Sequence, residues 1–300
     1  MPRGDGLMSA RAVEAVEAEA GSPGYRALIT ILAYALPVAF ILLPLILFLI
    51  QSFFYVDHGD IVRELTLRNY ERFFTGPAFL PVFLKTCALC LGVAVITVLV
   101  GYPVALLIAS LAGRRKYVLM VIFVVPLMMS YIIKIYAIRA ILGSNGFLNR
   151  ILLFLGVIDE PLTFLIFNLQ AVMLTLAVIL LPFAMLPIFI ALERIPRSLV
   201  DASFDLGASG LQTFRDVIWP LSAQGTIVGG TFVFVLAIGD FITPQMVGGA
   251  NGFTFGRIIY SQFGFAFNWP FGAALSVILL VAVLIALGAG SLLARTRHQP

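Results

Sequence analysis

The sequence predicts an all-α integral membrane protein with six transmembrane helices. Hydrophobic residues make up 61% of its 300 residues, charged residues only 11%, and the mean hydropathy is +1.06. Soluble domains hold about 45–50% apolar and about 25% charged residues. The apolar residues form long continuous runs, unlike the alternating strands of a membrane β-barrel. This composition excludes a disordered chain, a nucleic-acid binder and a disulfide scaffold.

Six runs are long enough to cross a bilayer, which requires about 20 apolar residues. We expect spans at residues 27–54, 81–112, 117–142, 162–192, 221–247 and 271–294. They form a transmembrane domain, 27–294, between an N-terminal tail, 1–26, and a C-terminal tail, 295–300. The N-terminal tail does not resemble a cleaved signal peptide, so the first span is expected to be an uncleaved anchor.

Basic residues predict the orientation of these spans. An even number of spans places both termini on one side, and that side holds eleven of the Lys and Arg residues, against five on the other. The eleven are Arg3, Arg11, Arg26, Arg114, Arg115, Lys116, Arg194, Arg197, Arg215, Arg295 and Arg297. By the positive-inside rule, both termini are expected in the cytoplasm of a bacterial cell, with the protein in its inner membrane.

The sequence offers little for catalysis or metal binding. It contains no G-x-x-x-x-G-K-[ST] pattern for nucleotide phosphates. His58 and His298 lie far apart, so no metal site is expected. Cys87 and Cys90 lie one turn apart in the second span and are interpreted as packing residues. The sequence favours a protein that is not an enzyme.

The connection between the fourth and fifth spans, 193–220, is the most informative loop. Its pattern predicts two short helices separated by a turn. Ser198 and Asp201 resemble a capping box for the first helix, and Gly207 suits the left-handed conformation that ends it. The second helix is expected at 211–218, closed by Pro220 before the fifth span.

Seven residues of this loop follow the spacing E-A-A-x3-G-x9-I-x-L-P, namely Asp201, Ala202, Ser203, Gly207, Val217, Trp219 and Pro220. The loop therefore resembles the EAA loop of permease subunits in binding-protein-dependent ABC importers. The departures are Asp for Glu, Ser for the second Ala, Val for Ile and Trp for Leu. Each keeps the charge, the size class or the apolar character of the family residue.

Residues 30–295 narrow the resemblance to the B-type permeases of spermidine/putrescine importers. The segments that carry it include Leu142-Gly143-Ser144-Asn145-Gly146-Phe147-Leu148-Asn149, Gly239-Asp240-Phe241-Ile242-Thr243-Pro244 and Asn268-Trp269-Pro270-Phe271-Gly272. The resemblance implies a MetI-like permease fold with a cytoplasmic EAA coupling helix, and a polyamine or related amine as solute. An importer for ferric iron, a phosphonate or an amino-acid derivative is the alternative within the family.

The resemblance also implies the partners. A second permease subunit, of the C type, would complete the pathway, and a periplasmic binding protein would deliver the solute. Two P-loop ATPase subunits would bind ATP and Mg²⁺, so this chain itself would hold no cofactor. The EAA helix would sit in a groove of an ATPase and transmit its closure to the spans. A secondary transporter is less favoured, because we find no internal repeat.

Two charges within the spans are candidates for the solute pathway, since charged residues in membranes are costly and often functional. Asp240 is the one acid expected inside a span, and Lys134 is expected at a similar depth. One interpretation is a structural ion pair between them, or a Lys134 side chain that extends to the membrane surface. The other is that Asp240 lines the pathway and attracts a cation, with the aromatic faces of Tyr131 and Tyr136 beside it. Lys134 counts against a pathway for cations alone, unless Asp240 or a second subunit neutralises its charge.

Small residues and prolines in the spans have simpler interpretations. Gly225 and Gly229 form a G-x-x-x-G pattern in the fifth span, which we interpret as a site of close helix packing. Several prolines are expected to kink the spans, namely Pro126, Pro182, Pro187 and Pro244.

Overall fold

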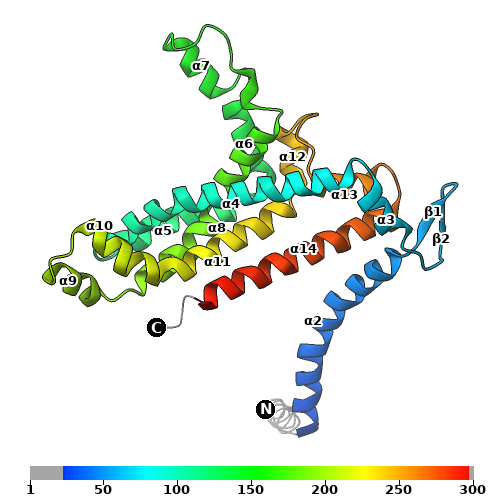
Figure 1. Cartoon of the computed structure of the whole chain (residues 1–300), viewed down its shortest axis with the longest axis horizontal. Helices are drawn as coiled ribbons and strands as arrows, with labels where there is room; N and C mark the ends of the chain where they lie inside the picture. The colour runs from blue at the N-terminus through cyan, green and yellow to red at the C-terminus, as the bar shows by residue number, and fades with distance from the viewer. Residues whose placement is uncertain (1–22, 297–300) are drawn as a thin grey trace, which may run out of the picture.

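Helix α8, Leu169–Glu193, lies at the centre of a helical bundle with α4, Phe79–Ser110, and α11, Trp219–Ile238 (Figure 1). Helix α14, Trp269–Thr296, packs along α11. The computed structural model describes residues 23–296. The expected tail segments 1–22 and 297–300, with His298, lie outside the described residues.

The contact between α8 and α11 depends on glycine. A Cβ atom on Gly225 would lie 2.6 Å from the carbonyl oxygen of Pro187, and one on Gly229 would lie 2.8 Å from that of Ala184. The two helices therefore approach more closely than any side chain would allow. The interpretation of the G-x-x-x-G pattern as a packing site is confirmed. Cys90 is also buried in the core between α4 and α8, as expected for a packing residue.

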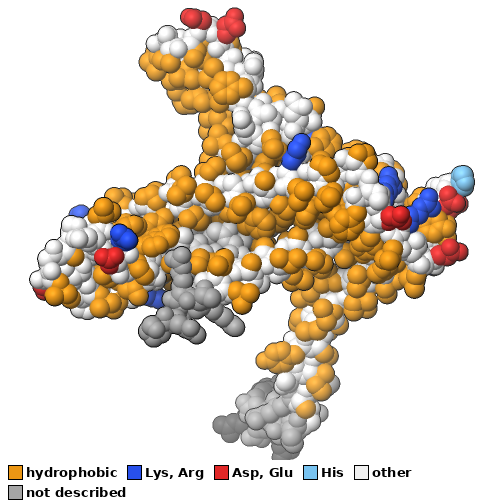
Figure 2. Space-filling model, viewed as in Figure 1, with side chains coloured by type: hydrophobic (Ala, Val, Ile, Leu, Met, Phe, Trp, Pro, Cys, Tyr) orange, Lys and Arg blue, Asp and Glu red, His pale blue; other side chains and the backbone are white. Residues whose placement is uncertain are grey.

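Two parts of the chain extend away from the bundle. Helix α2, Pro23–Gln51, diverges from it and contacts α14, while most of its apolar side chains remain exposed (Figures 1 and 2). An antiparallel hairpin, β1 Tyr55–Asp57 and β2 Asp60–Val62, follows α2 at one end of the bundle, with α3, Arg68–Thr75, beside it.

The expected third span, 117–142, is not one straight helix. It consists of α5, Arg115–Val124, a short 3-10 turn, Val125–Met128, and α6, Tyr131–Leu142, with a bend of 100° between the two parts. Pro126 lies in the 3-10 turn, and Ser130 has extended backbone angles before α6 begins. The depth expected for Lys134, counted along a straight helix, is therefore wrong. Helix α7, Phe147–Phe154, continues this arm away from the bundle (Figure 1).

The expected fourth and fifth spans also differ from the structure at their ends. A 3-10 turn, Thr163–Leu165, precedes α8, which begins only at Leu169. Helix α11 stops at Ile238, and the remainder of the expected fifth span forms α12, Ile242–Val247. Asp240 thus lies between two helices and not inside one, so its expected position within a span is wrong. Helix α13, Phe255–Gly264, leads back to α14.

The helices of residues 23–296 match a membrane protein in number and length. Five are long and apolar enough to cross a membrane, and the bent pair that includes α5 and α6 raises the count to six if it is one span. The helical membrane fold is therefore as the sequence predicts, but the third span is bent and the fifth ends at Ile238.

Candidate functional site

The loop between α8 and α11 forms a compact helical corner at one end of the bundle (Figure 1). Helix α9 runs over Arg197–Asp205 and follows Pro196. Because the helix starts at Arg197, Ser198 already lies in its first turn, and α9 has no side-chain cap. The expected capping box of Ser198 and Asp201 is therefore wrong.

Gly207 ends α9 in the conformation that the sequence indicates. Its φ is +84°, which glycine adopts without the clash that a Cβ atom would cause. The amide of Gly207 donates to the carbonyl oxygen of Phe204 at 2.9 Å, and that of Ala208 donates to the carbonyl oxygen of Ser203 at 3.1 Å. These two bonds form a Schellman motif, which fixes the direction of the chain after α9.

A hydroxyl pair joins α9 to the next helix. The Oγ atom of Ser203 lies 2.8 Å from Oγ1 of Thr213, which is buried in α10, Gly210–Thr213. A capping box of Ser209 and Gln212 begins α10, so the box lies one helix later than expected. Thr213 was not a candidate in the sequence, and its spacing from Ser203 carries no recognisable signal.

The outer surface of α9 and its turn is both apolar and charged. Asp201 and Ala202 are exposed. Leu206 and Leu211 expose 89% and 77% of their surface, although leucine is among the residues most often buried. A rigid helix that presents large apolar side chains beside an acid is suited to binding in a groove of another protein.

The residues after α10 join this corner directly to α11. A π-helix, Phe214–Ile218, contains Val217 and continues into α11 without a break. Pro220 lies in the first turn of α11, where its missing N–H is tolerated. The expectation that Pro220 closes a separate helix is therefore wrong. Trp219 packs against Tyr102 of α4, with ring centroids 5.3 Å apart.

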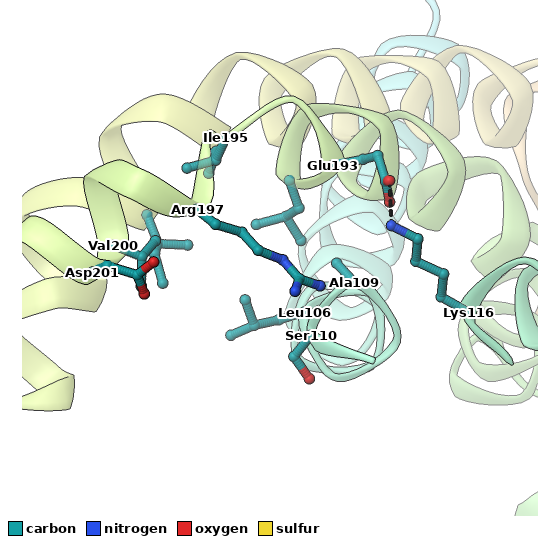
Figure 3. A pocket seen from close by; sticks show the side chains of 11 residues that line it. Leu106, Ala109, Ser110, Lys116, Glu193, Ile195, Arg197, Val200 and Asp201 are labelled. Carbon is teal, nitrogen blue, oxygen red and sulfur yellow. Dashed lines mark hydrogen bonds and ion pairs between the residues drawn. The ribbon is translucent and has the colours of Figure 1, made fainter. Parts of the chain in front are cut away.

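A cleft of about 350 Å³ lies between α4, the end of α8 and α9. Figure 3 shows the Arg197 side chain extending from α9 across this cleft toward Ala109 and Ser110 of α4. At its edge, Lys116 of α5 forms an ion pair with Glu193 at the end of α8. The hydroxyl of Tyr117 also donates to Glu193, at 3.1 Å. The N-terminal end of α5 is thus linked to the last residue of α8, which precedes the loop that leads to α9.

Of the four pathway candidates, Tyr131 and Asp240 meet at the connection between α11 and α12. The hydroxyl of Tyr131 donates to Oδ2 of Asp240 at 2.9 Å. Lys134 lies 5.5 Å from the centre of the Tyr131 ring, and Tyr136 is exposed further along α6. Within residues 23–296, no ion pair joins Lys134 to Asp240. The ion-pair interpretation is therefore wrong, because Tyr131 occupies the side of Asp240 that faces α6.

Thr243 completes this cluster and was not a candidate in the sequence. Its Oγ1 atom lies 2.9 Å from the Tyr131 hydroxyl. Its spacing from Tyr131 in the sequence carries no signal, because the two residues are 112 positions apart. Among the described residues, no group of three or more metal-binding side chains is found.

Comparison with known proteins shows which protein family this chain is similar to. Residues 101–295 match the model of the binding-protein-dependent transport system inner membrane component. The chain is 36% identical over 247 residues to the spermidine/putrescine transport system permease protein PotB of Escherichia coli K12, covering 82% of this chain and 89% of that one. It is also 36% identical over 253 residues to the inner membrane ABC transporter permease protein YdcU of the same organism, covering 79% and 80%.

Solved structures agree on the fold. A bacterial ABC transporter that imports the acidic polysaccharide alginate aligns with a TM-score of 0.71 at 15% identity, covering 96% of this chain and 100% of that chain. The MetNI methionine ABC transporter aligns with a TM-score of 0.53 at 20% identity, covering 75% and 100%. Identities this low indicate the shared architecture and leave the solute open.

Proposed function

This chain belongs to the family of binding-protein-dependent transport system inner membrane components, and on that basis we propose its solute, partners and mechanism. It is a multi-pass inner-membrane protein and the permease subunit of an ABC importer. Its relatives are transport subunits and not enzymes.

We propose that the solute is a polyamine, spermidine or putrescine. The observation that carries this proposal is the 36% identity to PotB over 82% of the chain. The match extends across the spans and is not limited to the loop that all ABC importer permeases resemble. This breadth supports a shared pathway and hence a related solute.

We propose that α9 is the coupling helix that docks on an ATPase subunit. Asp201 and Ala202 would face the ATPase groove with the exposed leucines. Ser203, through Thr213, and Gly207, through the Schellman motif, would hold the helix rigid against load. Val217, Trp219 and Pro220 would pass its movement into α11, since they lie in one uninterrupted helix, Gly210–Ile238.

The partners are proposed from the family. A second permease subunit of the C type, two P-loop ATPase subunits and a periplasmic binding protein would complete the importer. ATP and Mg²⁺ would be bound by the ATPase subunits. The distribution of basic residues supports a cytoplasmic position for both termini and for α9.

We also propose that the solute pathway passes along α6. Tyr136 exposes 57% of its surface there and is the aromatic side chain open to a solute, whereas Lys134 already lies over the ring of Tyr131. Aromatic faces are suited to a cationic amine. The contacts of Asp240 with its own chain indicate a different role for that residue.

Reconstitution of the four kinds of subunit in proteoliposomes tests the solute. We expect ATP-dependent uptake of radiolabelled putrescine or spermidine, and none with an ATPase variant that cannot hydrolyse ATP. A panel of ferric iron, 2-aminoethylphosphonate and amino acids serves as the comparison. Uptake of a panel member but of neither polyamine would contradict the proposed solute, and it would leave the assignment as an ABC importer permease intact.

One relative favours a second candidate within that panel. The chain is 23% identical over 243 residues to the putative 2-aminoethylphosphonate transport system permease protein PhnU of Salmonella typhimurium LT2. That compound also carries an amine, so competition between it and putrescine would separate the two candidates.

A further inference from the structure

The carboxylate of Asp240 is occupied by donors from its own chain. Oδ2 accepts the hydroxyl of Tyr131 at 2.9 Å, and Oδ1 accepts the amide of Ile242 at 3.0 Å. The amide of Thr243 lies 3.4 Å from Oδ1 and 3.3 Å from Oδ2. A carboxylate offers about four acceptor positions. Most of them are filled here without any solute.

The hydroxyl hydrogen bonds of this cluster have a defined direction. A tyrosine hydroxyl has one hydrogen, and the hydrogen of Tyr131 is given to the acceptor-only Asp240. The hydroxyl of Thr243 must therefore donate to the oxygen of Tyr131, at 2.9 Å. Thr243 is fully buried, so water does not compete with this bond. Tyr131, Asp240 and Thr243 thus form a hydrogen-bonded ring, which the backbone amide of Thr243 closes onto the carboxylate.

The ring joins the bent third membrane helix to the connection that follows the fifth, between α11 and α12. Tyr131 is the first residue of α6, directly after the 100° bend. Asp240 lies between α11 and α12, and its carboxylate accepts the amides of the first turn of α12. The hydroxyl of Tyr131 thus connects the bend of the third membrane helix to the end of the fifth and the start of α12.

Two further contacts hold α12 in place. A Cβ atom on Gly256 of α13 would lie 2.9 Å from the carbonyl oxygen of Asp240, so these backbones are in close contact. At the other end of α12, the amide of Phe167 donates to the carbonyl oxygen of Val247 at 2.8 Å. Helix α12 is therefore held at both ends, and only the Tyr131 contact links it to α6 through a side-chain hydrogen bond within residues 23–296.

We propose that Asp240 is a positioning residue of the transport cycle and not a binding site for solute. Through Tyr131 it holds the connection between α11 and α12 against the bend of the third membrane helix, so that α6 and α12 move together. This role rests on the proposed transport function, because it concerns movement during uptake. The role requires a hydrogen bond in either direction between residue 240 and Tyr131 and an acceptor for the amides of α12, and not the negative charge.

Four variants of the reconstituted importer separate the two roles of Asp240. Asp240→Asn removes the charge and keeps Oδ1 as an acceptor for the amides of α12, while its Nδ2 donates to the Tyr131 oxygen and the Tyr131 hydroxyl then donates to Thr243. Asp240→Ala removes the charge and every side-chain hydrogen bond. Tyr131→Phe removes the hydroxyl between the helices. Tyr260→Phe is the matched control, because Tyr260 stacks on Phe241 at 4.7 Å beside the break. Its hydroxyl has no hydrogen bond among residues 23–296.

Uptake kinetics per assembled complex give the first result. Asp240→Ala and Tyr131→Phe should lower Vmax by about tenfold with KM changed less than about twofold, because the lost contact acts on movement and not on binding. Asp240→Asn and Tyr260→Phe should stay within about twofold of the unmodified chain in both constants. A tenfold rise of KM for a cationic solute in Asp240→Asn would overturn the proposal in favour of solute binding.

Hydrogen exchange of the amides in Ile242–Val247 gives a second result that does not depend on any solute. Exchange should accelerate in Asp240→Ala and not in Asp240→Asn, since only alanine removes the acceptor. Normal Vmax per complex in both Asp240→Ala and Tyr131→Phe would overturn the proposal, even if less complex assembles. If the unmodified importer moves no polyamine, the proposed solute fails, while the exchange experiment still tests the contact.

Discussion

Ser203 shows how a single departure from the family pattern is explained by its neighbour. The EAA pattern has a second alanine at this position, where serine adds one hydroxyl. In the structure that hydroxyl lies 2.8 Å from the hydroxyl of the buried Thr213. A polar pair of this kind compensates the cost of burying Thr213 without a partner. The departure is therefore consistent with a rigid α9.

Gly207 gives the first prediction at this scale. Gly207→Pro should lower uptake by at least about tenfold while the subunit remains in the membrane, because proline fixes φ near −65° where the structure requires +84°. Uptake and ATP hydrolysis are measured on the same proteoliposomes, and we expect hydrolysis to persist without uptake.

Gly210→Pro is the matched control for this change. Gly210 is the first residue of α10, where proline is favourable, and Ser209 before it already has extended backbone angles. Equal losses of uptake in both variants would contradict a specific role for the turn at Gly207.

Lys134 gives the second prediction. If the pathway for a cationic solute follows α6, Lys134→Met should lower KM for putrescine, because it removes a like charge from the path. Lys134→Arg keeps the charge and should leave KM unchanged. An unchanged KM in Lys134→Met, measured by uptake at varied putrescine concentrations, would remove Lys134 from the pathway.

At the scale of elements, the ion pair of Lys116 and Glu193 links α5 to α8 at the residue before the α9 loop. Lys116→Glu places two like charges together and should reduce uptake several-fold. The double variant Lys116→Glu with Glu193→Lys restores the opposite charges and should recover most of it. Uptake in the double variant no better than in the single one would show that the pair itself does not matter.

The elements also show what the sequence can and cannot predict. The apolar runs predict where α4, α8 and α14 lie, because length and hydropathy are what a bilayer selects. The breaks at Ser130 and Gly239 are not predicted, because the apolar runs continue on both sides of them. A hydropathy profile does not show where a helix bends or ends within such a run. Pro126 and Pro244 mark the neighbourhood of these breaks but do not fix their angle.

The candidate site is predictable to a similar degree. The spacing from Asp201 to Pro220 predicts the loop, and Gly207 predicts its turn, because only glycine readily adopts that φ. The partners of Asp240 are not predictable from spacing, because Tyr131 is 109 residues away in the chain. A contact of that range depends on the angle and direction of the bend in the third membrane helix, and Pro126 indicates neither.

At the scale of the molecule, the two ends of the bundle differ. Helices α9 and α10 lie at one end, and the β1–β2 hairpin lies at the other (Figure 1). With α9 in the cytoplasm, a membrane-impermeant maleimide should label His58→Cys in intact spheroplasts and Leu206→Cys only after the membrane is opened. Cys87 and Cys90 lie within α4 and provide the background signal. The reverse labelling pattern would invert the proposed orientation.

The uninterrupted helix Gly210–Ile238 has 29 residues, and at 1.5 Å per residue it is a rod about 43 Å long. A tilt of about 5° at its α10 end would displace the far end by about 4 Å, by lever geometry applied to that length. The displaced end is the one that carries Asp240. A small rotation of this helix at one surface of the membrane would therefore move the connection between α11 and α12 by more than a bond length. No helix would have to unfold.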